Sequence, residues 1–300
     1  MPACELSPIH LKEGQTLQDR YLVVRLLGRG GMGAVYLAED QRLSGRLWAV
    51  KEMVCYDQVM VAQATQNFER EAQMLAGLRH KSLPMITDYF SEGGRSYLVM
   101  EFVEGVTLSR VVEQEGPLPE LVAMRWALEL TQVLDYLHRQ HPPVIFRDLK
   151  PENIMVTHSV SGPAGEQRLI KLIDFGLARH FDPEKRRDTQ ASGSVGYAAP
   201  EQWEDSRQTD RRSDIYSLGG TLYYILTGKA PSPIYGSHRI RPYRKDIGPD
   251  TEALVLRSLQ PDPRQRYQDA AEVMRDVLLI LARLGDPRPE TPAPRPVAAP

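Results

Sequence analysis

Two acids, a lysine and an amide lie close together near the middle of the chain. Asp148, Lys150 and Asn153 fall within six residues, and Asp174 follows 21 residues after the amide. This set suits phosphoryl transfer, in which one carboxylate takes the proton of an attacking hydroxyl while another carboxylate and an amide oxygen hold a metal. The acceptor would be a hydroxyl group and the donor a nucleoside triphosphate.

A glycine-rich segment near the N-terminus could bind the phosphates. Gly28, Gly30 and Gly33 lie between two predicted strands, so the segment is a hairpin and not the strand-to-helix turn of a dinucleotide fold. Backbone N–H groups of glycines can close over phosphates. A plain tight turn would explain the same residues, and only the motifs that follow favour the phosphate interpretation.

A lysine and a glutamate are expected to form a pair. Lys51 lies on a predicted strand 18 residues past Gly33, and Glu71 lies on the apolar face of a predicted helix. A carboxylate on the buried side of a helix is costly unless it meets a cation. Two unrelated charges are the alternative, but the pair would give a fixed cation for the donor's phosphates.

The elements that must position these residues fall into two groups. β-Branched and aromatic runs predict strands in the first hundred residues, and helical spacing predicts one helix there, at 65–78. Beyond Thr107 the apolar pattern is mainly helical. The strands are expected at 21–27, 34–38, 47–53 and 96–102, the later helices at 119–138, 214–226 and 270–284, and a hairpin at 154–156 and 169–173 around the loop 157–168.

Composition excludes several classes of protein. The 37 Lys and Arg residues nearly balance the 39 Asp and Glu residues, so nucleic acid and an anionic membrane are not expected as main partners. Two cysteines give no disulfide framework and suit the cytoplasm. No apolar run approaches the roughly 20 residues of a membrane helix. Six of the last fifteen residues are proline, which predicts an extended tail; an anchor beyond it is left open.

The order of these motifs resembles the eukaryotic-like protein kinases, and most closely their bacterial serine/threonine branch. The resemblance covers about residues 17–284 and implies an α+β, two-lobed fold with a small antiparallel β lobe, one key helix and a larger, mainly helical lobe. It divides the chain into an extension at 1–16, a small lobe at about 17–100, a hinge at 101–105, a large lobe at about 106–284 and the tail at 285–300. The matching motifs are Gly28-x-Gly30-x-x-Gly33-x-Val35, Ala49-Val50-Lys51, Glu71, Arg147-Asp148-Leu149-Lys150-Pro151-Glu152-Asn153, Asp174-Phe175-Gly176 and Ala199-Pro200-Glu201-Gln202.

The resemblance assigns roles to individual residues. Asp148 would accept the proton of the substrate hydroxyl, Lys150 would offset charge on the transferred group, and Asn153 and Asp174 would ligate magnesium, or manganese in its place. The Glu101 carbonyl and the Val103 N–H would hydrogen-bond the adenine of ATP. Apolar contacts to the adenine would come from Val35, Ala49, Met155 and, as gatekeeper, Met100.

Further positions in the resemblance concern the substrate and the activation segment. Lys150 indicates a serine/threonine kinase, and the Ser194 hydroxyl would bond both Asp148 and Lys150. Phe146 stands where the family usually has histidine. It would fill an apolar column that runs through Leu75 and Phe175 down to Asp214, which anchors the loop backbone, and only the hydrogen bond of the imidazole would be lost. In the same resemblance Glu201 and Arg266 form a buried ion pair that secures the segment.

Two other functions share part of this pattern. A catalytically inactive scaffold of the same fold usually lacks the strand lysine, the loop aspartate or the metal aspartate, whereas Lys51, Asp148 and Asp174 are all present. A small-molecule phosphotransferase would lack the segment that ends at Glu201. The expected partners are therefore protein substrates, with a homodimer for phosphorylation between copies.

Arg147, beside the catalytic acid, predicts control by phosphorylation of the segment between Gly176 and Ala199. We expect Thr189 to be the main regulatory site and Ser192 the second, because Ser194 has a role at the catalytic site. Replacing Thr189 and Ser192 together by alanine should lower both the phosphate content, measured by mass spectrometry, and the rate of phosphorylation. Unchanged phosphate content and rate would contradict this prediction.

Overall fold

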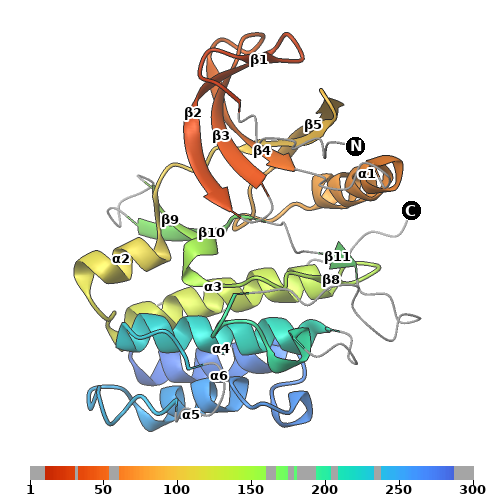
Figure 1. Cartoon of the computed structure of the whole chain (residues 1–300). Coiled ribbons are helices and arrows are strands. Elements are labelled where there is room, and N and C mark those ends of the chain that lie inside the picture. Colours follow the sequence, from red (N-terminus) through yellow and green to blue (C-terminus); the bar gives the residue numbers. More distant parts are fainter. Residues whose placement is uncertain are drawn as a thin grey trace, which may run out of the picture.

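The structure is a computed structural model that describes residues 11–30, 33–53, 61–159, 167–174, 179–180, 194–203, 209–232 and 238–286. The side chains at a few of these positions, Glu71 among them, lie outside that description. An antiparallel sheet with one helix lies above a larger helical region, as Figure 1 shows. This is the two-lobed α+β fold that the sequence predicted.

The small lobe is built on a six-stranded antiparallel sheet in the order β1-β2-β3-β4-β6-β5. Side chains alternate between its faces: Trp48 and Val50 join a cluster on one face, whereas Ala49 between them joins the core shared with the large lobe. The strands are β1 (Thr16–Leu17), β2 (Tyr21–Gly30), β3 (Gly33–Asp40), β4 (Arg46–Met53), β5 (Ile86–Glu92) and β6 (Arg95–Glu101).

The helix of the small lobe, α1 (Val61–Gly77), packs against β5 and β6. It begins four residues before the range predicted from its apolar spacing. Strand β5 was not predicted, because polar residues interrupt its apolar ones: Asp88 and Ser91 stand among Ile86, Tyr89 and Phe90. Its pairing with β6 supplies the stabilisation that its own sequence pattern does not indicate.

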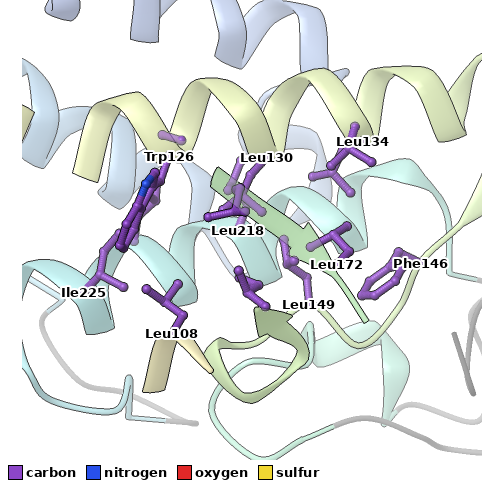
Figure 2. Close-up of a cluster of buried hydrophobic side chains, with 14 of the residues drawn as sticks. Leu108, Trp126, Leu130, Leu134, Phe146, Leu149, Leu172, Leu218 and Ile225 are labelled. Carbon is purple, nitrogen blue, oxygen red and sulfur yellow. The ribbon is translucent and has the colours of Figure 1, made fainter. Parts of the chain in front are cut away.

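The large lobe is organised around α4, which is buried on nearly all sides. Helix α3 packs against α6, and α4 packs against both α3 and α5. The apolar stripe that predicted α3 is its buried face, and Trp126, Leu130 and Leu134 point into the cluster drawn in Figure 2. The helices are α2 (Leu108–Glu115), α3 (Glu120–His138), α4 (Arg211–Thr227), α5 (Pro249–Ser258) and α6 (Ala270–Arg283).

Small sheets lie where the two lobes meet. Strand β7 (Val106–Thr107) pairs with β9 (Ile154–Ser159), which pairs with β10 (Gln167–Leu172); β8 (Val144–Ile145) pairs with β11 (Arg179–His180). The predicted hairpin is present, but its strands run farther into the expected loop. Gly105 allows the close approach of the hinge to β9, because a Cβ atom there would lie 2.2 Å from the Val156 carbonyl oxygen.

Among the described residues, no helix combines the length and the apolar composition that a membrane span requires.

A buried ion pair joins two distant parts of the large lobe. Both guanidinium NH groups of Arg266 reach the Glu201 carboxylate, at 2.7 and 2.8 Å, and the remaining N–H groups donate to the backbone carbonyls of Gln260, Pro261 and Arg212. Arg266 is 1% and Glu201 4% exposed. The predicted pair is thus present, and every charged atom in it has a partner.

Replacing Arg266 by methionine should lower the free energy of unfolding by about 3–5 kcal/mol, because the Glu201 carboxylate would stay buried without its cation. Denaturant unfolding followed by circular dichroism measures the change. Arg264→Met is the matched control: that side chain is 84% exposed and pairs with Asp262 at the surface, so we expect a change below about 0.5 kcal/mol. Equal stability of the two variants would contradict the prediction.

Candidate active site

Asp148 and Lys150 meet at the hydroxyl of Ser194. The Lys150 Nζ lies 2.5 Å from the Ser194 Oγ, which donates to the Asp148 Oδ1 at 3.0 Å. The same lysine approaches the Asp148 Oδ2 at 3.1 Å. The contact predicted for Ser194 is therefore present, although Ser194 lies 46 positions after Asp148 in the chain. An acid, a cation and a hydroxyl form one hydrogen-bonded group.

The backbone of this loop is held by Asp214, in the first turn of α4. The Asp214 Oδ2 accepts from the Phe146 N–H at 2.9 Å, and its Oδ1 accepts from the Arg147 N–H at 2.7 Å. The His138 Nε2, at the end of α3, lies 2.8 Å from the Asp214 Oδ2. Because the carboxylate can only accept, this nitrogen must donate. Asp214 anchors the loop as predicted, and His138 is an additional partner that the sequence analysis missed.

Arg147 is held in a strained backbone conformation. Its φ is +69°, in the left-handed region that residues other than glycine seldom adopt, at a typical cost of about 1–3 kcal/mol. Its N–H is fixed by Asp214, and its carbonyl oxygen accepts from the Gln202 Nε2 at 2.9 Å. Burial lowers the pKa of its guanidinium, and the nearby Asp214 carboxylate acts in the opposite direction.

Phe146 is fully buried, in the same apolar cluster as Leu75. Figure 2 shows its ring beside Leu172, with Leu149 nearby. Two members of the predicted column, Phe146 and Leu75, thus belong to the same apolar core; its other expected member, Phe175, lies outside the described residues. An imidazole does contact Asp214, but it comes from His138 and not from position 146.

Lys51, on β4, forms an ion pair with the Asp174 Oδ1 across the two lobes. The lysine is buried, whereas the Asp174 side chain is 44% exposed and its backbone, with φ +67°, is left-handed. The predicted pair of Lys51 with Glu71 stays a prediction, because the Glu71 side chain lies outside the described residues. The structure therefore brings the strand lysine to the second acid of the site.

Asn153 and Asp174 fit a hard divalent cation. The Ile173 N–H donates to the Asn153 carbonyl at 2.8 Å, which brings the two ligand positions next to each other. The Asn153 Nδ2 donates to the Asp148 Oδ2 at 2.8 Å, so the amide oxygen is left for another partner. One carboxylate and one amide oxygen suit a cation that keeps several waters.

The residues predicted to enclose an adenine lie on neighbouring strands. Ala49 is paired with Met100 across β4 and β6, Val35 is on β3 beside Lys51, and Met155 is on β9 in the large lobe. Ala49 and Met100 are buried, and Val35 and Met155 are partly exposed. These positions are compatible with an apolar slot between the lobes.

The hinge follows β6, and the glycine-rich hairpin joins β2 and β3 of the same sheet. Glu101 is the last residue of β6 and Val103 follows it in the hinge. Gly28 and Gly30 end β2 and Gly33 begins β3, where Gly33 has a φ of +138° that favours glycine. The hairpin is thus present on both sides of its tip, which lies outside the described residues.

Two predicted regulatory residues, Thr189 and Ser192, also lie outside the described residues. The sequence analysis missed two contributions to the site: the contact of His138 with Asp214 and the hydrogen bonds of the Gln202 side chain. Gln202 donates to Arg147 and accepts from the Ala199 N–H at 3.0 Å. A glutamine directly after the matched Ala199-Pro200-Glu201 motif was visible, but its partner 55 residues earlier could not be found from spacing.

Comparisons with known proteins agree with this geometry. The family model described as "Protein kinase domain" matches residues 21–279. The serine/threonine-protein kinase PknB of Mycolicibacterium smegmatis is 36% identical over 285 residues, which are 89% of this chain and 44% of that protein. PknB of Mycobacterium tuberculosis is 36% identical over 295 residues, which are 92% of this chain and 45% of that protein. The chain thus spans less than half the length of these relatives.

A solved structure supports the fold. The kinase domain of Mycobacterium tuberculosis PknI aligns with a TM-score of 0.69 and covers 90% of this chain and 99% of that chain. At 24% identity this likeness concerns the fold alone.

The cation site can be tested without measuring activity. Asp174→Asn and Asn153→Leu should each weaken Mn²⁺ binding by about tenfold or more in the presence of a non-hydrolysable ATP analogue, because the first removes the negative charge of a ligand and the second removes an oxygen ligand. The electron paramagnetic resonance signal of free Mn²⁺ measures the binding. Asp246→Asn, in an exposed pair with Arg244, is the control. Unaltered Mn²⁺ affinity in both site variants would refute the assignment.

Proposed function

This chain belongs to the protein kinase domain family, and from that premise we propose that it transfers the γ-phosphoryl group of ATP to a serine or threonine hydroxyl of a protein. The observation that carries the proposal is the Ser194 hydroxyl, which contacts both Asp148 and Lys150. A substrate hydroxyl that reaches Asp148 would meet the carboxylate that accepts its proton, with the Lys150 ammonium beside the same carboxylate oxygens. The named serine/threonine kinases among the relatives support the choice of substrate class.

Asp148 would act as the base of the reaction. Its carboxylate is 13% exposed and is oriented by Ser194 and Asn153, so one geometry is held before the substrate arrives. Lys150 would balance the charge of the transferred group. Asn153 and Asp174 would hold magnesium, or manganese, which when bound neutralises charge on the phosphates.

The nucleotide would lie between the lobes, with its adenine at the hinge. The glycine hairpin would cover the phosphates, and Lys51 would contact them while Glu71 fixes the lysine. The expected adenine contacts are Val35, Ala49, Met100, Glu101, Val103 and Met155. We propose that the kinase domain spans about residues 17–284, with the hinge at 101–105.

Regulation would act through Arg147. Arg147 directly precedes Asp148 in the chain, and its guanidinium would suit a phosphate on Thr189 or Ser192, because guanidinium and phosphate groups form charge-assisted hydrogen bonds. We further propose that two copies of the chain meet and phosphorylate one another. ATP and protein hydroxyls as substrates favour a cytoplasmic reaction.

The proposal predicts that the chain, incubated with magnesium and radiolabelled ATP, labels itself and that Asp148→Asn does not. The loss of a general base lowers such rates by about a hundredfold to ten-thousandfold. The exposed variant Asp246→Asn should label as the unmodified chain does. Absence of label from both the unmodified chain and the control would favour an inactive scaffold, and full labelling of Asp148→Asn would exclude Asp148 as the base.

The same experiment tests transfer between copies. A longer, tagged Asp148→Asn chain is mixed with the unmodified chain, and the two are separated by electrophoresis. Label on the tagged, inactive chain is expected. Label confined to the unmodified chain would contradict phosphorylation between copies.

A further inference from the structure

We infer that Lys171 is a nucleotide-positioning residue: its ion pair with Glu101 sets the spacing between the hinge and the floor of the adenine slot. The inference rests on the proposed function and deepens it. Lys171 is on β10 of the large lobe, Glu101 ends β6 of the small lobe, and neither side chain has another role in the proposed chemistry.

The ion pair crosses the boundary between the lobes. The Lys171 Nζ lies 2.6 Å from the Glu101 Oε1 and 2.7 Å from its Oε2, so the ammonium faces both carboxylate oxygens. The two residues are 70 positions apart. Their side chains are 21% and 33% exposed, so water screens the pair only in part.

Glu101 is fixed from two further sides. Its N–H donates to the Met85 carbonyl at 2.8 Å, and its Oε2 accepts from the Met85 N–H at 3.3 Å. The backbone and the side chain of Glu101 are therefore both held by the segment before β5. Lys171 adds a side-chain contact between this hinge unit and the large lobe, beside the backbone bond from the Leu172 N–H to the Ser82 carbonyl.

Lys171 is also directly connected to the floor of the slot. It lies opposite Met155 in the antiparallel register of β9 and β10, and opposite residues project from the same face with Cβ atoms about 4.5–5.5 Å apart. Lys171 reaches Glu101 from this face, so Met155 lies on the face turned toward the hinge. The far end of the hinge is already held to β9, because Thr107 of β7 lies opposite Met155. The ion pair therefore sets the position of the near end, at Glu101, relative to Met155.

The other end of the site is anchored independently. After Lys171, the Leu172 N–H donates to the Ser82 carbonyl and the Ile173 N–H donates to the Asn153 carbonyl, both at 2.8 Å. These two bonds hold the chain just before Asp174. Loss of the Lys171 side chain should consequently affect the adenine end of the nucleotide much more than the phosphate end.

The test compares three probes on the full chain by calorimetry: adenosine, ATP with magnesium, and inorganic tripolyphosphate with magnesium. In Lys171→Met, the affinities for adenosine and for ATP should fall by the same factor, about threefold to tenfold, as expected for a half-buried charged hydrogen bond. The affinity for tripolyphosphate should not change. Lys171→Arg, which keeps the charge, should restore most of the adenosine affinity.

Arg168→Met is the matched control. Arg168 lies on the same strand and pairs with Glu115 of α2 at 2.7 and 2.9 Å, but that pair stays within the large lobe. The control should bind adenosine as the unmodified chain does. A similar loss in Arg168→Met would show general damage to the hairpin and overturn the inference, as would unchanged adenosine affinity in Lys171→Met.

The probes also separate this inference from the proposed function. If the unmodified chain binds ATP and Lys171→Met binds adenosine equally well, only the role of Lys171 is wrong. If the unmodified chain binds none of the three probes, the proposed kinase function itself fails. A loss confined to tripolyphosphate would place Lys171 at the phosphate end and contradict the assignment.

Discussion

The buried carboxylate of Asp214 is the constraint on which the site depends. It has no exposed surface, and it accepts from two consecutive backbone N–H groups and from the His138 ring. A buried carboxylate is tolerated only when its oxygens are hydrogen-bonded, so the fold and the loop stabilise each other. The loop takes its shape from α4, the most deeply buried helix of the large lobe.

A second buried acid, Glu201, supports the same loop through the residue that follows it, Gln202. Glu201 pairs with Arg266 and also accepts a hydrogen bond from the Oγ of Ser213 at 2.8 Å. Ser213 directly precedes Asp214 in the chain. Gln202 holds the Arg147 carbonyl. Arg147 can therefore keep its left-handed backbone because both of its peptide groups are fixed by buried partners. The packed lobe thus maintains the strained backbone of Arg147, and this backbone positions Asp148, the next residue in the chain.

The sequence predicted much of this arrangement, for identifiable reasons. Apolar stripes located α3 and α6, and the resemblance to the protein kinases predicted the contact of Ser194 with Asp148 and Lys150. Other features had no local signal. Strand β5 depends on pairing with β6, and α2 and α5 are too short for a clear periodicity. The roles of His138, Gln202 and Lys171 depend on partners more than 50 residues away. Glu71, Thr189 and Ser192 remain predictions.

The central claim is that Asp214 holds the catalytic loop in its shape. Hydrogen exchange of the Phe146 and Arg147 amides, measured by nuclear magnetic resonance in Asp214→Asn and in the exposed control Asp250→Asn, tests it most directly. The side-chain nitrogen of asparagine can only donate hydrogen bonds. One of the N–H groups that bond to the Asp214 carboxylate would therefore face a second donor instead of an acceptor. The account predicts faster exchange at these two amides in Asp214→Asn, with α6 still protected and the control unchanged. Undiminished protection of both amides in Asp214→Asn would contradict it.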